Sequence, residues 1–149
     1  MRRLTVVAIL FFVPALYPAG RAQEPVRKAL HLGGGKKFAM KAAPTSPAAT
    51  GEVIVGRDKN GNTKIDLKVD HMAQPDRLKP PKNVYVVWIQ SPQGSGPENK
   101  GELNVNGGVK ASVKTVTPYR NFEIFITAED NAQTTAPSGP EVLRASVQS

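Results

Sequence analysis

Two glycine-containing stretches have the composition of ligand-binding loops but not the spacing. The stretch DKNGNT at 58–63 has the composition of a calcium loop. An EF-hand loop needs Gly at its sixth position and an acid at its twelfth, and here Gly61 is fourth and Val69 twelfth. In GGGKK at 33–37, the first glycine of a phosphate loop is replaced by Leu30. The first stretch is interpreted as a turn and the second as part of a tether.

Candidate nucleophiles and metal ligands also lack the partner residues that a catalytic or metal site requires. A serine-hydrolase elbow needs Gly two residues before and after the serine, and around Ser95 these positions hold Gln93 and Pro97. The only histidines are His31 and His71, and a zinc site needs several converging ligands. His71 is therefore interpreted as a solvated loop residue.

One acidic pair, Glu129 and Asp130, follows a predicted strand. Carboxylates serve as general acids and bases, but neighbouring side chains in an extended segment point to opposite sides. The pair is interpreted as an exposed strand end. With no convergent set of residues, we expect no enzyme activity, no metal site and no cofactor.

The first residues have the pattern of a secretory signal peptide. Arg2 and Arg3 precede the apolar run LTVVAILFFVPAL, and a cleavage site with small residues lies between Ala22 and Gln23. The 13-residue run spans roughly 20 Å as a helix, less than a bilayer core of about 30 Å. We expect cleavage, an exported chain that is periplasmic or secreted, and no stable membrane span afterwards. The alternative is an uncleaved anchor.

Cysteine content and charge limit the classes that remain. The chain has no cysteine, so packing alone must stabilise the exported domain. The net charge of +8 is concentrated before residue 51, because residues 51–149 carry twelve basic and eleven acidic side chains. A nucleic-acid-binding domain concentrates positive charge on its folded part, so no nucleic-acid partner is expected.

Residues 23–50 are rich in Gly, Ala, Pro and basic side chains, which predicts a flexible linker. Its positive charges either are simply solvated or rest on an anionic lipid or glycan surface. From residue 51 to 149 the pattern changes to short segments of period two, which predicts one domain made of half-buried strands.

The alternation also predicts strand register. Apolar residues occupy odd positions on both sides of residues 60–62, as in Val55 and Leu67, so the loop must contain an odd number of residues. A three-residue Asn60-Gly61-Asn62 loop fits. The same parity recurs around residues 106–108, between Leu103 and Val113.

The segment Val84–Ile89 is apolar on both faces, which predicts a central strand. Trp88 is expected to fill the space between two sheets, and a sugar-stacking platform is the alternative. About seven strands without intervening helices predict an all-β antiparallel sandwich of immunoglobulin or fibronectin type. The predicted core residues are Tyr85, Trp88, Phe122, Ile124 and Ile126.

The order of several segments resembles the C-terminal, extracytoplasmic domain of anti-sigma-K factors. They are GEVIVGRDKNGNTKIDLKV, VYVVW, KGELNVNGG and the block FEIFITAEDNAQTTAPSGPEVLRASV, which together cover about residues 51–147. The resemblance implies a bacterial, exported β-sandwich, the outer half of a membrane signalling protein. It does not extend to the cytoplasmic sigma-binding segment or the transmembrane helix, so sigma-factor inhibition is not carried over.

We therefore expect an exported, non-enzymatic interaction module of the cell envelope, with a protein or another envelope component as its partner. Binding through loops and a sheet edge is expected. The candidate contact residues are Tyr119, Arg120, Glu129 and Asp130. The alternative is a secreted carbohydrate-binding module with an aromatic strip of Tyr85, Trp88 and Tyr119.

Overall fold

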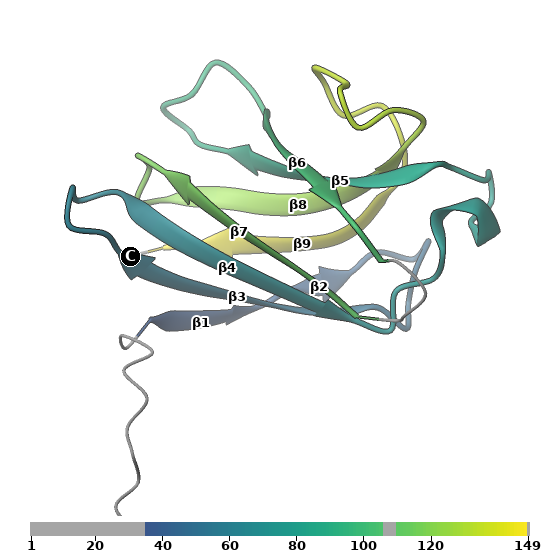
Figure 1. The fold of residues 1–149 in the computed structure, drawn as a ribbon, viewed down its shortest axis with the longest axis horizontal. Coiled ribbons are helices and arrows are strands. Elements are labelled where there is room, and N and C mark those ends of the chain that lie inside the picture. The colour runs from purple at the N-terminus through teal and green to yellow at the C-terminus, as the bar shows by residue number, and fades with distance from the viewer. Residues whose placement is uncertain (1–34, 106–109, 149) are drawn as a thin grey trace, which may run out of the picture. The chain divides into compact units, whose positions relative to one another are not determined.

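Two antiparallel β-sheets pack face to face in the computed structural model, which describes residues 35–105 and 110–148 (Figure 1). The predicted all-β sandwich is confirmed, with nine strands among the described residues. They are β1 (Lys36–Ala39), β2 (Lys41–Ala42), β3 (Thr50–Arg57), β4 (Thr63–Asp70), β5 (Val84–Gln90), β6 (Glu98–Leu103), β7 (Ala111–Thr117), β8 (Phe122–Glu129) and β9 (Glu141–Val147), with one 3-10 turn at Pro75–Arg77.

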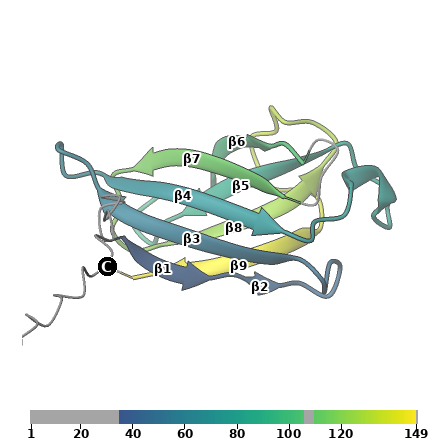
Figure 2. The same ribbon diagram turned by 60° about the horizontal axis from the view of Figure 1, so that its bottom comes forward.

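The four-stranded sheet has the order β1-β3-β4-β7 and the five-stranded sheet the order β2-β9-β8-β5-β6. Figure 2 shows the four-stranded sheet in front, with β5, β8 and β9 behind it. The connectivity differs from that of an immunoglobulin domain. If β1 and β2 are counted together as the first strand, β3 and β4 are the second and third strands, and they form a hairpin within one sheet. In an immunoglobulin domain the second and third strands lie in different sheets.

The β3–β4 hairpin has the predicted parity but a longer loop. Val55 lies opposite Ile65 and Arg57 opposite Thr63, so apolar residues of both strands share one face. The loop is five residues, 58–62, instead of the expected three. The Asp58 carboxylate accepts hydrogen bonds from the backbone N–H of Asn60 and Asn62, and this Asx turn adds the two extra residues.

The register predicted around residues 106–108 was wrong. Leu103 ends β6 in the five-stranded sheet, whereas Val113 lies in β7 of the four-stranded sheet. The chain therefore crosses from one sheet to the other instead of forming a hairpin. Residues 106–109 themselves lie outside the described residues.

The predicted linker 23–50 and the domain start at residue 51 are corrected by β1 and β2. β1 pairs with β3 in one sheet, and β2 pairs with β9 in the other. Between them, Met40 is buried and its N–H donates to the carbonyl of Gly51 at 2.8 Å. Residues 36–42 thus connect the two sheets and close one side of the sandwich. The predicted signal peptide, with Ala22 and Gln23, lies outside the described residues.

The main core lies between the sheets and contains Tyr85, Phe122, Ile124 and Ile126. Burial raises the pKa of Tyr85 to about 12, and its hydroxyl donates to the carbonyl of Ala73 at 3.0 Å. The placement of Trp88 between the sheets was wrong. Its indole is fully buried, but it belongs to a second cluster with Val86 and Phe125 on the outer face of the five-stranded sheet.

The role of residues 36–42 can be tested with Met40→Ala. We expect this variant to lose about 2–5 kcal/mol in the free energy of unfolding, measured by urea denaturation, because it leaves a cavity at the junction of the sheets. The control is Lys41→Ala at the neighbouring exposed position, which should change stability by less than about 0.5 kcal/mol. Equal effects of the two substitutions would mean that this segment is only a tether.

Candidate interaction surfaces

The structure does not bring the four predicted contact residues together. Tyr119 and Arg120 precede β8, and Glu129 and Asp130 lie at its other end. An eight-residue strand is roughly 27 Å long, so they cannot form one site. Asp130 is exposed and pairs with Lys82, whose Nζ lies 2.8 Å from its carboxylate.

Tyr119 is half-buried and its polar atoms are used inside the domain. Its hydroxyl donates to Glu98 at 2.9 Å, and its backbone carbonyl accepts a hydrogen bond from the hydroxyl of Thr63 at 2.8 Å. The bond to Glu98 raises the pKa of Tyr119. Hydrogen bonds from Lys100 and Tyr119 lower the pKa of Glu98. Tyr119 therefore joins the β7–β8 turn to β4 and β6 and does not present a free ring.

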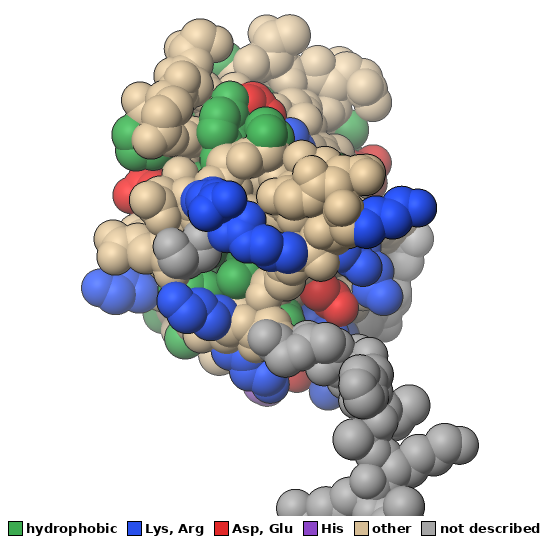
Figure 3. Space-filling model, turned by 90° about the vertical axis from the view of Figure 1, so that its left-hand side faces the viewer, with side chains coloured by type: hydrophobic (Ala, Val, Ile, Leu, Met, Phe, Trp, Pro, Cys, Tyr) green, Lys and Arg blue, Asp and Glu red, His purple; other side chains and the backbone are tan. Residues whose placement is uncertain are grey.

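Arg120 lies next to this junction and is exposed. Because Tyr119 bonds to Thr63, Arg120 belongs to the same end of the sandwich as the β3–β4 turn, with exposed Arg57 and Lys59. Figure 3 views this end and shows basic side chains spread across it, with few acidic ones. Arg120 is thus one of several exposed cations and not a distinct site.

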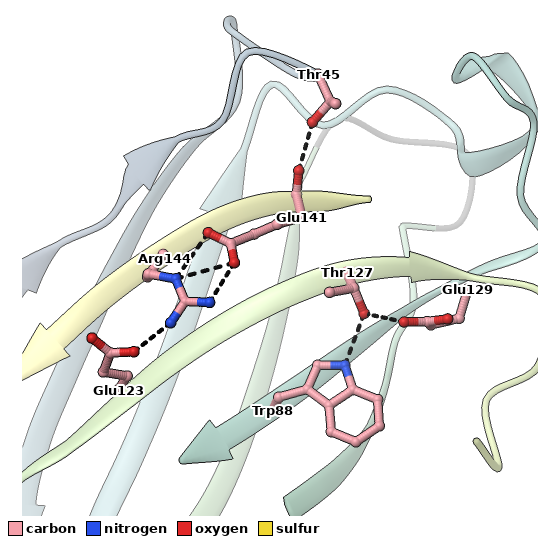
Figure 4. Close-up of polar contacts among 7 residues, drawn as sticks. All are labelled: Thr45, Trp88, Glu123, Thr127, Glu129, Glu141 and Arg144. Atoms are coloured by element: carbon pink, nitrogen blue, oxygen red, sulfur yellow. Dashed lines mark hydrogen bonds and ion pairs between the residues drawn. The ribbon is translucent and has the colours of Figure 1, made fainter. Parts of the chain in front are cut away.

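Glu129 is fully buried, which corrects its interpretation as an exposed contact residue. The Trp88 indole N–H donates to the Thr127 hydroxyl at 2.8 Å, and that hydroxyl donates to the Glu129 carboxylate at 2.6 Å (Figure 4). The other donors are the Ser138 N–H at 3.0 Å, the Ser138 hydroxyl at 2.6 Å and the Gly139 N–H at 3.0 Å. A buried carboxylate with four donors ties the loop after β8 to the sheet.

Two opposing effects act on the pKa of Glu129. Burial alone raises it, because a low dielectric disfavours the charged form. The hydrogen bonds from Ser138, Thr127 and Gly139 together outweigh burial and hold the pKa of this carboxyl below its ordinary value. The carboxylate is therefore charged in the folded protein at neutral pH.

Gly139 is required by the same junction. A Cβ atom at this position would lie 1.7 Å from the carbonyl oxygen of Ala128, so no other residue fits without moving the backbone. The Ala128 N–H donates to the carbonyl of Pro140 at 2.9 Å. The stretches 126–129 and 137–140, which contribute to the family resemblance, are thus held together by side-chain and backbone bonds.

The outer face of the five-stranded sheet is closed by a row of large side chains. Trp88, Phe125 and Arg144 are directly opposed on β5, β8 and β9. The two rings stack with centroids 6.5 Å apart, and the guanidinium lies 4.3 Å from the Phe125 centroid. Figure 4 shows the guanidinium held between Glu123 and Glu141.

This arrangement removes the aromatic strip that carbohydrate binding required. Trp88 and Tyr85 are both 0% exposed, and they lie on opposite faces of β5. Tyr119 is used in internal hydrogen bonds. The three aromatic side chains therefore do not form an exposed surface.

The outer face of the four-stranded sheet carries exposed lysines, which occupy polar positions of the alternating pattern in β4 and β7. Lys64 and Lys68 flank Asp66 on β4, and Lys114 lies opposite Asp66 on β7. We call Lys64, Lys68 and Lys114 the lysine patch. All three side chains are exposed, whereas Asp66 is partly buried. Three cations around one carboxylate leave this area positive.

Other charges on this face are paired. Lys37 lies 3.2 Å from Glu52, and Lys110 lies 3.2 Å from Asp70. These pairs are exposed and contribute little to stability, but they cancel local charge. The excess positive charge of the face therefore lies at the lysine patch, beside β7.

β7 presents an unpaired edge. All seven of its residues are in register with β4, without a bulge, and no strand within 35–105 or 110–148 pairs with its other side. It also carries Val116, which is 52% exposed and is the exposed large hydrophobic residue of the described part of the chain. A regular edge strand with free backbone groups can accept another strand.

The edge on the same side of the other sheet is protected. β6 pairs with β5 with a register shift, and its Gly101 has a φ of 106°. Its Asn99 amide donates to the carbonyls of Ala132 and Thr134, at 2.9 and 2.8 Å, so the loop after β8 lies against this strand. Bulges and covering loops are common ways to block an edge, and within residues 35–105 and 110–148 neither is found at β7.

Within residues 35–105 and 110–148, no group of three or more His, Cys, Asp or Glu could hold a metal ion. His71 is exposed, as predicted, and His31 lies outside these residues. No helix in this part of the chain is long and apolar enough to span a membrane.

Comparison with known proteins gives no assignment. No family model matches the chain, and no curated protein matches it.

Glu129→Gln tests the buried junction. The amide NH2 would face the N–H of Ser138 if it replaces Oε1, or the N–H of Gly139 if it replaces Oε2, so one backbone donor loses its acceptor in either orientation. We therefore expect the variant to be about 1.5–3 kcal/mol less stable at pH 7. The native pKa of Glu129 is lowered, so its contribution is present above the ordinary value of 4.5 and is lost as pH falls through the native pKa. The stability difference from wild type should therefore shrink below pH 4.5.

Urea denaturation at pH 7 and at pH 3 measures both effects. The control is Glu102→Gln, which changes an exposed glutamate of β6 and should behave as wild type at both pH values. A constant difference between wild type and Glu129→Gln across this pH range would contradict a lowered pKa of Glu129 in the native state.

Gly139→Ala should displace the loop, because the new methyl group meets a backbone carbonyl. We expect a loss of at least about 2 kcal/mol in the free energy of unfolding and increased iodide quenching of Trp88, the only tryptophan. Gly56→Ala is the control, since nothing lies within 4 Å of a Cβ there. Unchanged quenching in Gly139→Ala would show that the loop does not shield the indole.

Proposed function

We propose that this protein is an exported, non-enzymatic interaction module that binds a protein component of the bacterial cell envelope by pairing a strand with the edge of β7. The observation that carries the proposal is the seven-residue edge of β7, which is regular and unpaired among the described residues. Strand addition gives affinity through main-chain hydrogen bonds and specificity through alternate side chains.

Two features of the sequence support export and an envelope setting. Residues 1–22 have the pattern of a cleaved signal peptide, and the domain resembles the outer domain of anti-sigma-K factors. That resemblance supports a role in envelope signalling or sensing. It provides no basis for sigma-factor inhibition.

The proposal is tested with the mature chain, residues 23–149, used as bait in envelope extracts. Bound proteins are identified by mass spectrometry, and the purified complex is studied by hydrogen–deuterium exchange. We expect the bound partner to slow amide exchange in β7 and to leave exchange in β6 unchanged, since the β6 edge is protected by its register shift and by the loop after β8.

The comparison between these two edge strands is an internal control within one molecule. A partner that protects loops or a sheet face, but not β7, would overturn the proposed mode of binding. Absence of any specific partner at every salt concentration would remove the proposed function.

A further inference from the structure

We propose that the β7 edge selects an extended segment with acidic side chains on the face of the lysine patch and apolar or β-branched side chains on the other face. This inference rests on the proposed function, since it names the partner of the same edge. It follows from the position of three lysines relative to the edge, from the inner face of β7 and from the cost of pairing two copies of β7.

The lysine patch lies within reach of an added strand. A strand beside β7 would lie about 4.8 Å from it, so its side chains would stand directly opposite those of β7. Lys114 would therefore face the added strand across one strand spacing. Lys64 and Lys68 lie one strand further in, diagonal to Lys114, because they are opposite Val116 and Ser112. They lie on the same face of the sheet as Lys114, so their charges add to the positive field near the edge.

Asp66 does not neutralise this field. It is one carboxylate beside three exposed cations, and the other nearby carboxylate, that of Glu52 opposite Lys68, is already paired with Lys37. The Oδ1 atom of Asp66 is buried without a hydrogen-bond partner in the described structure. The neighbouring lysines Lys37 and Lys110 already have carboxylate partners. Carboxylates on an added strand would therefore meet cations that no salt bridge in the described structure occupies, and opposite charges directly across strands are favourable.

The other face of β7 sets the second requirement. Ala111 and Val113 are partly buried and pack against the main core, and Thr115 is also partly buried. An added strand would extend this inner face. Apolar or β-branched side chains on its inward face would cover Val113 and gain from burial, whereas charged ones would be desolvated.

The same lysines act against a second copy of this chain. Antiparallel pairing of two β7 strands over all seven residues has only one register, in which Ala111 lies opposite Thr117 and Lys114 lies opposite Lys114 of the second copy. Like charges directly opposite each other destabilise a strand pair. Edge lysines commonly prevent such pairing. Here they reject self-association and accept an acidic strand.

Three eight-residue peptides provide the test: alternating Val-Glu, Val-Ser and Val-Lys. Affinity is measured by titration of labelled peptide into the mature chain, and the binding site by amide exchange in β7. We expect the Val-Glu peptide to bind on the order of tenfold more tightly than Val-Ser, and Val-Lys more weakly than both. The preference for Val-Glu should weaken as salt increases.

Charge-reversal variants test whether the lysine patch causes the preference for the Val-Glu peptide. The variant Lys64→Glu/Lys68→Glu/Lys114→Glu should lose the preference for Val-Glu and bind Val-Lys best. The control Lys41→Glu/Lys59→Glu/Lys79→Glu makes the same change in net charge at exposed lysines elsewhere, and it should keep the wild-type order. Loss of the preference in both variants would show a general charge effect and would overturn the assignment to the lysine patch.

The outcomes separate this inference from the proposed function. Equal binding of Val-Glu and Val-Ser, with slowed exchange in β7, would overturn acidic selection and leave edge pairing intact. Failure of all three peptides to slow exchange in β7 would contradict edge pairing itself. A wild-type dimer with protected β7 amides would identify a second copy as the occupant and would overturn selection of an acidic partner.

Discussion

The inner faces of the two sheets must be buried against each other, and the rest of the structure depends on this burial because the chain has no cysteine. A sandwich also has two open sides. One side is closed by the chain itself, since β1 and β2 belong to different sheets and Met40 fills the space between them. On the other side, no strand of the described part of the chain joins the two sheets, so β6 and β7 remain as edges. The chain thus closes the core on one side only, and this leaves β6, which is protected, and β7, which is regular, as edge strands on the other side.

The two outer faces differ for a related reason. On the five-stranded sheet, Trp88 and Phe125 need cover, and Arg144 and the loop after β8 supply it. Glu129 fixes that loop by accepting four hydrogen bonds in a buried position. The outer face of the four-stranded sheet carries mainly charged and small side chains, with Ile54 and Val116 as the larger apolar residues, and it is left uncovered among the described residues. A surface for a partner is therefore left on one sheet and removed from the other.

Period-two alternation was sufficient to predict most strands after residue 50, the sandwich and the parity of the first hairpin, because alternation reports directly on one buried face. It did not reveal β1 and β2, which lie in the predicted linker. It could not assign β5, which is apolar on both faces, so the sequence did not show that Tyr85 and not Trp88 lies between the sheets. Burial of Glu129 depends on donors nine and ten residues away, which no local pattern reveals. The lysines of β4 were visible, but their importance depends on which strand forms the edge, and that is a property of the topology.

One row of opposed residues crosses the whole five-stranded sheet: Lys41, Arg144, Phe125, Trp88 and Asn99. Within this row the side chains of Trp88, Phe125 and Arg144 contact one another in sequence, so the effects of replacing two of these three residues will not be additive. Replacing Trp88 removes the ring on which Phe125 stacks. A shift of the Phe125 ring would in turn change its contact with the Arg144 guanidinium. In related sequences, a replacement at one of these three positions should therefore be accompanied by a compensating replacement on the adjacent strand.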